Sequence, residues 1–107
     1  MKYLTLNEEI LLLCIWRLGN DAYGVAIRDL YVETTGNKIV LGTMYNSLDY
    51  LVKKKYVSTW KGEASPERGG KAKTFFKVTN LGLQTLKRTR ELQNLIWNGM
   101  PDTIFAD

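Results

Sequence analysis

The order in which helical and strand-like spacings of apolar residues follow one another limits the fold of this 107-residue chain more than any other feature. Apolar residues three and four apart predict helices, whereas β-branched and aromatic residues between turn formers predict strands. The expected elements are, in order, helices over 5–18, 23–35 and 41–54, strands over 56–61 and 73–78, and a helix over 79–98. This order predicts an α+β, mostly α, winged helix-turn-helix with one further helix at its C-terminal end.

The ends of these elements carry their own signals. Thr5 and Glu8 have the spacing of a capping box at the start of the first helix, and Gly19 is expected to end that helix. Asn20–Asp21 offers a cap for the second helix. Ile39–Val40 is expected to form a short strand before the third helix.

The last helix carries apolar residues on two sides. Thr79 is expected to cap it, and Gly99 and Pro101 are its stop signals. One stripe is Leu83, Leu86, Trp97 and Met100, and the other is Leu81, Leu92, Leu95 and Ile96. Because burying each large apolar side chain stabilises by roughly 1.5–3 kcal/mol, we expect a two-fold dimer that covers the second stripe. The apolar first helix is expected to take part, and the candidate interface residues are Leu12, Trp16, Leu92, Leu95, Ile96 and Trp97.

Positive charge is concentrated in one segment. The chain has 15 basic and 11 acidic residues, a net charge of +4. Between Lys53 and Lys77 there are eight basic residues but only two acids, Glu63 and Glu67, so this segment carries more net positive charge than the whole chain. The segment spans the end of the third helix and the predicted hairpin. The net charge permits a polyanionic partner without requiring one, and its concentration in one segment shows where such a partner would bind.

The third helix has an apolar stripe and a polar face. Tyr45 lies on the stripe and is expected in the core with its hydroxyl at the rim. A helix fits the major groove of DNA, where polar side chains can reach base edges or phosphates, and Gly42 lets backbone amides approach a phosphate. The candidate DNA-binding residues of this helix are Gly42, Thr43, Asn46, Ser47, Tyr50, Lys53 and Lys54.

The loop of the predicted hairpin supplies a second basic feature. Arg68, Lys71 and Lys73 cluster around the tight turn that Gly69–Gly70 permits. Such a tip could straddle a phosphate backbone or enter a minor groove. Taken singly, the helix could be a solvated amphipathic helix and the loop a solubilising tip. Because the two features occur together, double-stranded DNA is the expected partner.

Enzymatic activity, a metal site and a cofactor are not expected. The chain has no histidine and therefore no imidazole base or ligand. Its single cysteine, Cys14, lies in an apolar run and is expected to fill the core, and no zinc-binding spacing is present. No stretch has the roughly 18–20 apolar residues of a membrane span, and the N-terminus lacks the pattern of a signal peptide. We expect a cytoplasmic protein that does not bind membranes.

Three segments together resemble the PadR family of transcription regulators, over about residues 4–98. Residues 41–51 (LGTMYNSLDYL) resemble the third helix of that family, 66–79 (PERGGKAKTFFKVT) its wing, and 22–27 (AYGVAI) the start of its second helix. The resemblance implies a homodimer, held by a single C-terminal helix as in the compact subfamily, that represses a nearby promoter at a palindrome-like operator. The wing resembles that of members encoded beside transporters or permeases. Some members respond to phenolic or drug-like ligands.

Two positions depart from the family pattern. Tyr50 stands where members often have a basic residue, so the preferred DNA sequence is expected to differ. Lys55 stands where a glycine commonly ends the third helix. Lys55 must therefore accept a left-handed conformation, at a cost of about 1 kcal/mol, or the helix must end differently.

The sequence therefore predicts a DNA-binding regulator of one domain. Residues 1–79 would form its DNA-binding winged helix, 80–100 its dimerisation helix and 101–107 a tail. Two alternatives stay open. One is a winged helix that binds proteins without DNA. The other is a repressor gated by a small aromatic ligand at the dimer interface, where Trp16 and Trp97 would line the pocket.

Overall fold

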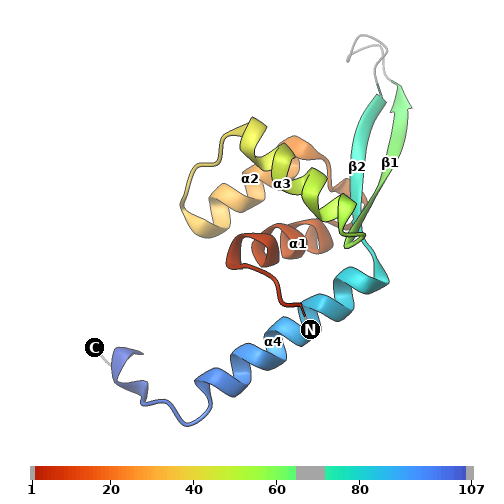
Figure 1. Ribbon diagram of the computed structural model, residues 1–107. Coiled ribbons are helices and arrows are strands. Elements are labelled where there is room, and N and C mark those ends of the chain that lie inside the picture. Colours follow the sequence, from red (N-terminus) through yellow and green to blue (C-terminus); the bar gives the residue numbers. More distant parts are fainter. Residues whose placement is uncertain (1, 65–71, 106–107) are drawn as a thin grey trace.

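A computed structural model describes residues 2–64 and 72–105 of the chain, and its elements follow the expected order (Figure 1). The elements are α1 (Leu6–Leu18), the short 3-10 helix η1 (Gly19–Asp21), α2 (Gly24–Thr35), α3 (Leu41–Lys53), β1 (Val57–Ala64), β2 (Ala72–Val78), α4 (Asn80–Trp97) and the 3-10 helix η3 (Asp102–Phe105). The expected mostly helical α+β class is confirmed. The β1–β2 hairpin, called the wing below, projects from one end of the helical body.

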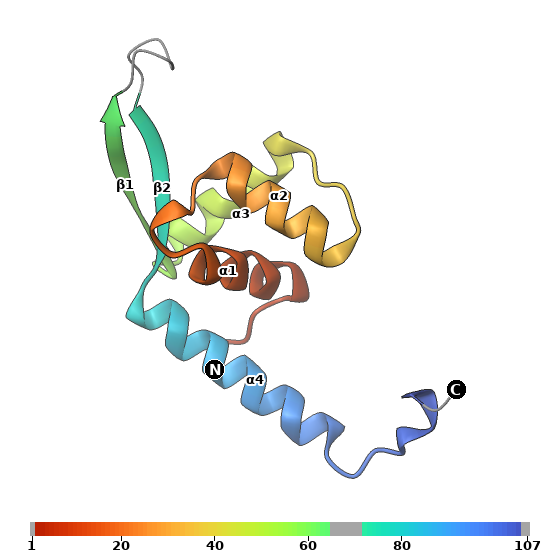
Figure 2. The ribbon, with the colours of Figure 1, turned by 180° about the vertical axis from the view of Figure 1, so that it is seen from behind.

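The core forms around α1, which lies between the α2–α3 pair and α4 in both views (Figures 1 and 2). Its most enclosed side chains have no exposed surface; they are Leu11, Leu12, Ala22, Ile27, Met44, Leu48 and Leu51. Cys14 is also buried, which confirms its expected place in the core. Leu12 was expected at a dimer interface, and this prediction is wrong. Because the side chain of Leu12 is enclosed by its own chain, it has no surface left for a partner.

The start of α1 has the expected capping box. The Thr5 hydroxyl accepts from the Glu8 amide at 3.2 Å, and the Glu8 carboxylate accepts from the Thr5 amide at 2.8 Å. Gly19 ends the helix with a φ of 58°. The expected cap at Asn20–Asp21 is wrong, because these residues belong to η1 and α2 begins at Gly24 without a side-chain cap.

The expected strand at Ile39–Val40 is also wrong, since this segment is a connection without strand pairing and Val40 is exposed. The free edge of β2 is occupied by another segment. The Phe76 amide donates to the Ala22 carbonyl at 2.8 Å, and Tyr23 forms an isolated bridge with Phe75. Residues 22–23 therefore take the position at the sheet edge that a third strand would need.

The wing is a two-stranded antiparallel sheet. Its register pairs Val57 with Val78 and Trp60 with Phe75, and the register shifts between Lys61 and Ala64. β1 runs three residues further than the expected end at Lys61. Val57 and Val78 are buried at the base of the wing, so the hairpin is anchored where it leaves the helical body.

The C-terminal helix α4 packs on the domain through a narrow strip of mostly small residues. The buried members are Gly82, Thr85, Leu86 and Thr89. Beyond this strip the helix runs past the edge of the domain (Figures 1 and 2). The radius of gyration is 16.2 Å, whereas a compact domain of this length has a radius of roughly 13 Å. The wing and the C-terminal end of α4 extend from the helical body and contribute to the larger radius (Figure 1).

Candidate nucleic-acid interface

The α3 helix presents one buried face and one polar face. Met44, Leu48 and Leu51 have no exposed surface and anchor the helix in the core. Asn46 is exposed and lies two residues from both Met44 and Leu48, which places it on the opposite side of the helix. The other exposed residues predicted to contact DNA are Gly42, Thr43, Tyr50 and Lys53, and Ser47 and Lys54 are half-buried. We call these seven residues the α3 polar face.

Members of the α3 polar face differ in what they can offer a partner. The hydroxyl of Ser47 donates to the Thr43 carbonyl at 3.2 Å, so its hydrogen is engaged within the helix and its lone pairs are left to accept. The amino nitrogen of Lys54 lies 5.5 Å from the centre of the Tyr50 ring, a cation–π distance. The side chain of Asn46 carries both donors and an acceptor, which suits it to reading a base edge.

Tyr45 differs from its expected place. Its side chain is exposed, and its hydroxyl end reaches the start of α2. A Cβ atom at Gly24 would lie only 1.8 Å from the Tyr45 hydroxyl oxygen. The phenol therefore occupies space that is free because residue 24 is a glycine. The helical spacing of Tyr45 suggested a core residue, and the signal that could have corrected this was the glycine in a distant segment.

The wing meets the same end of α2. The amino nitrogen of Lys73 lies 3.8 Å from the centre of the Tyr23 ring. Tyr23 packs edge-on against Phe75 at 5.7 Å, and Phe75 stacks on Trp60 at 4.4 Å. A Cβ at Gly62 would lie 3.2 Å from the Phe75 ring, so this glycine leaves room for the stack. We call Tyr23, Trp60 and Phe75 the wing stack; spacing along the chain did not indicate it, because Tyr23 comes from another element.

Lys73 of the wing and Tyr45 of α3 thus converge on two consecutive residues, Tyr23 and Gly24. The wing residue Lys73 therefore lies on the side of the domain toward which α3 extends Tyr45. Arg68 and Lys71, the other wing residues predicted to contact DNA, lie outside the described residues.

Two further charges near α3 were not recognised in the sequence. The side chain of Lys2 lies next to that of Lys54, and hydrogen bonding and repulsion from this second ammonium lower the pKa of Lys2. Asp49 is exposed and lies three residues from Asn46, where its negative charge opposes the surrounding lysines.

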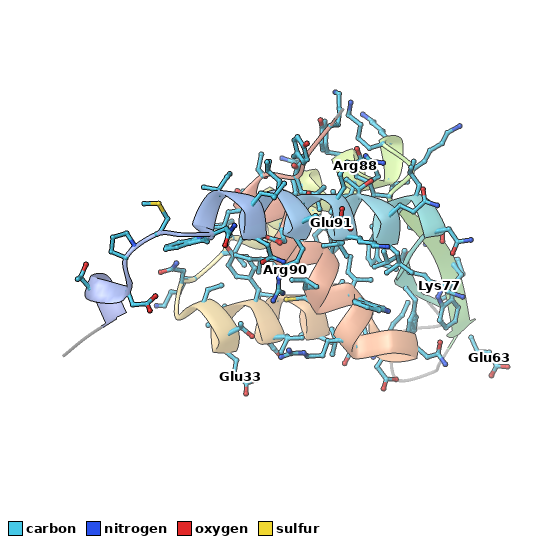
Figure 3. All side chains as sticks on the ribbon, turned by 90° about the horizontal axis from the view of Figure 1, so that it is seen from below. Glu33, Glu63, Lys77, Arg88, Arg90 and Glu91 are labelled. Atoms are coloured by element: carbon cyan, nitrogen blue, oxygen red, sulfur yellow. The ribbon has the colours of Figure 1, made fainter. Side chains whose placement is uncertain are left out.

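A groove of about 400 Å³ runs between α1 and α4. It is lined by Glu9, Leu13, Trp16, Leu83, Leu86, Lys87 and Arg90. Trp16 therefore borders a largely apolar space, but Trp97 is not part of this lining, so the two tryptophans predicted to share a pocket are not brought together within one chain. In the view from the α4 side, Arg88 and Arg90 lie on opposite edges of α4 (Figure 3).

Polar contacts hold α4 against the N-terminal segment. The Leu4 amide donates to the Thr89 hydroxyl at 3.1 Å in the interior, and Gln93 donates to the carboxylate of Glu9 at 2.9 Å. Glu9 is only 9% exposed. Both contacts join residues more than 80 positions apart along the chain, so spacing in the sequence did not indicate them.

The thiol of Cys14 is enclosed in the core. Burial raises the pKa of the Cys14 thiol, which keeps it protonated and a poor nucleophile. Over residues 2–64 and 72–105, no group of three acidic or thiol side chains is placed to hold a metal ion. Within the same ranges no helix is long and apolar enough to span a membrane.

Solved structures of transcription regulators share this arrangement. A PadR-like regulator from Bacillus cereus matches with a TM-score of 0.74 and 16% identity, over 95% of this chain and 94% of its own. A PadR-like transcription factor from Bacteroides fragilis matches with a TM-score of 0.73 and 20% identity, over 85% and 82% of the two chains. This chain has the PadR-like winged-helix fold. A complex of RosR-S4 also matches, with a TM-score of 0.69 and 24% identity, over 92% and 78%. No protein-family model and no curated protein sequence matches the chain.

Within this PadR-like fold, the departure at Lys55 is resolved. Lys55 has a φ of 65°, in the left-handed region. Its amide donates to the Val52 carbonyl, and the Tyr56 amide donates to the Leu51 carbonyl. These two bonds form a Schellman motif, the helix end that usually has a glycine at this position. Here Lys55 takes the place of that glycine. The lysine accepts the left-handed conformation because the motif satisfies the last carbonyls of the helix.

Proposed function

We propose that this protein is a DNA-binding transcription regulator of the PadR family. The observation that supports the proposal is the convergence of Lys73 and Tyr45 on Tyr23–Gly24, since it brings the basic wing to the side of the domain toward which α3 extends Tyr45, the neighbour of Asn46. In the proposed complex, α3 lies in the major groove and Asn46 reads a base edge. The wing contributes cations to the phosphate backbone.

We further propose that it binds as a homodimer joined through α4. The exposed end of this helix carries Leu95, Ile96 and Trp97, with 72%, 62% and 54% of their surfaces in solvent. Trp16 on α1 is also exposed, and its indole ring lines the groove between α1 and α4. A two-fold pair places two copies of α3 side by side, and this fits a palindrome-like operator.

The proposed biological role is repression, with a transporter or permease gene as the regulated neighbour. This role rests on the resemblance of residues 66–70 to the wing of such regulators. A regulator of this kind acts in the cytoplasm, in agreement with the free thiol of Cys14.

Salt dependence tests the DNA-binding proposal against the alternative of a protein-binding winged helix. The full-length chain is used to select duplexes from a random pool, and the affinity for the selected duplex is measured by fluorescence anisotropy between about 50 and 200 mM salt. Binding through several lysines must weaken steeply, because counterions are released. If no duplex is selected, or if affinity hardly changes with salt, the proposal is wrong.

A second function, gating by a small aromatic ligand, is favoured by the apolar groove beside Trp16. Titration with planar aromatic compounds would quench tryptophan fluorescence and weaken DNA binding if the groove takes such ligands. A Trp16→Leu variant should lose the part of the quenching that comes from this groove. A flat titration would remove this candidate.

A further inference from the structure

The end of α3 and the start of α4 meet at one small contact region. It consists of Lys55 and Tyr56, which follow α3, and of Thr79 and Gly82, which begin α4. We call these four residues the Thr79 junction. Both views show α4 leaving the base of the wing next to the end of α3 and then running away from it (Figures 1 and 2).

One hydroxyl group connects the two helices. The Thr79 hydroxyl donates to the Lys55 carbonyl at 2.6 Å and accepts from the Gly82 amide at 3.0 Å. The Thr79 amide also donates to the Tyr56 carbonyl at 3.0 Å. Thr79 therefore caps α4 and, with the hydrogen of the same hydroxyl, holds the backbone that ends α3. A hydroxyl can do both because it has one donor and two acceptor sites.

The absence of a side chain at Gly82 makes the contact close. A Cβ atom there would lie 2.3 Å from the Tyr56 carbonyl oxygen and 2.8 Å from a methyl group of Val78. The first of these is a backbone atom that cannot turn aside. Any larger residue at position 82 must therefore move α4 away from the end of α3. Lys55 has a left-handed backbone conformation, which fixes the direction of its carbonyl group. This carbonyl accepts the hydrogen bond from the Thr79 hydroxyl.

The angle at this junction has a large effect at the far end of α4. The helix has 18 residues and a length of about 27 Å. The exposed residues Leu95 and Ile96 lie roughly 22 Å from its start. A tilt of about 10° at the junction would move them by roughly 4 Å, which is close to the 3.4 Å rise of one DNA base pair.

We propose that the Thr79 hydroxyl and the missing side chain at Gly82 set the angle between α3 and α4, and thereby determine the half-site spacing that the dimer prefers. The inference rests on the proposed function, because it takes α4 as the dimer contact and α3 as the helix that reads DNA. In this proposal Thr79 and Gly82 are positioning residues, since they act through the placement of α3 and α4. The two copies of α3 are separated by a distance that the junction sets twice, once in each subunit.

Three variants separate positioning from simple capping. Thr79→Ser keeps the hydroxyl and is the matched control. Thr79→Asp keeps an acceptor for the Gly82 amide and so preserves the cap, but a carboxylate cannot donate to the Lys55 carbonyl. Gly82→Ala leaves every hydrogen-bonding group in the chain but adds a Cβ atom that forces the helices apart. If Thr79 only capped α4, Thr79→Asp would have the same half-site spacing preference as wild type, because aspartate is among the best capping residues.

The first measurement uses DNA. A duplex selected by the wild-type chain supplies the half-site, and duplexes with the two half-sites moved apart or together in steps of one base pair give the spacing profile. We expect wild type and Thr79→Ser to share one optimum. Gly82→Ala and Thr79→Asp should shift the optimum by roughly one to two base pairs or flatten the profile, with affinity for a single half-site unchanged. Profiles that coincide with wild type would overturn the inference.

The second measurement does not depend on DNA. A spin label on Asn46→Cys reports the distance between the two copies of α3 in the dimer, while Cys14 is buried and takes no label. Gly82→Ala and Thr79→Asp should shift or broaden this distance, and Thr79→Ser should not. If the wild-type chain selects no DNA but the label distances behave as expected, the proposed function fails and the positioning role stands. If the labelled chain with no other substitution shows no measurable distance between two labels, it does not form the proposed dimer, and both the dimer and the inference are contradicted.

Discussion

The amino nitrogen of Lys73 on the wing lies 3.8 Å from the centre of the Tyr23 ring at the start of α2. This contact crosses 50 positions of sequence and is supported by Phe75, which packs edge-on against the same ring. The wing is consequently held against the helical body on the side where Tyr45 reaches Gly24. A partner that binds α3 on this side also meets the wing.

Removing the charge of Lys73 should weaken DNA binding without changing the preferred sequence. A lysine that contacts the phosphate backbone supplies affinity to every duplex alike, so Lys73→Ala should lower the slope of log affinity against log salt by about one unit. Anisotropy titrations on a selected duplex and on an unrelated duplex measure both effects. Lys77→Ala is the control, because Lys77 carries the same charge on the same strand but lies beside Asn80 at the base of the wing. Equal effects of the two changes would contradict the assignment of Lys73.

Asn46→Ala should change which sequences are bound. Asn46 lies at the centre of the exposed side of α3, and an amide that reads a base edge contributes about 1–3 kcal/mol of discrimination. Selection from a random pool with the variant should give a motif that has lost one position, with an unchanged salt slope. If wild type and variant select the same motif, Asn46 does not contact a base edge.

Charges at the end of α4 should separate the dimer. Leu95→Asp and Ile96→Asp place a carboxylate on an exposed apolar side chain, which costs little in the monomer but is unfavourable within an apolar interface. Sedimentation should give the monomer mass for both variants, with thermal unfolding still cooperative. Val40→Asp is the matched control, since Val40 is 73% exposed and Leu95 is 72% exposed. A dimer mass for all three variants would remove α4 from the interface.

Lys55→Gly should stabilise the folded state. The φ of 65° is a conformation that glycine adopts readily, whereas a residue with a Cβ atom pays about 1 kcal/mol. Chemical denaturation should show a free energy of unfolding that is higher by roughly this amount. Lys54→Gly serves as the comparison, because Lys54 has an ordinary helical φ of −76° and should be destabilised by glycine. A loss of stability in Lys55→Gly would show that the lysine side chain makes a contact worth more than the strain.

The order of elements and most of their ends could be predicted from the sequence alone. The capping box at Thr5 and the break at Gly19 depend on residues within one or two helical turns, so short-range spacing indicates them. For Lys55 the sequence left two possibilities, a left-handed residue or a different helix end, and the structure shows the first. The buried positions Met44, Leu48 and Leu51 of α3 could be predicted for the same reason, whereas Tyr45, predicted on the same stripe, is exposed. These features follow from local hydrogen bonding and from the 3.6-residue period of a helix.

Only the tertiary structure decided which distant residues meet. It enclosed Leu12 on all sides and so removed it from the interface residues, and it paired residues 22–23 with β2 in place of a strand at Ile39–Val40. It also placed Thr79 against Lys55. Each of these contacts joins segments whose separation depends on how whole helices pack, and local spacing carries no information about that packing.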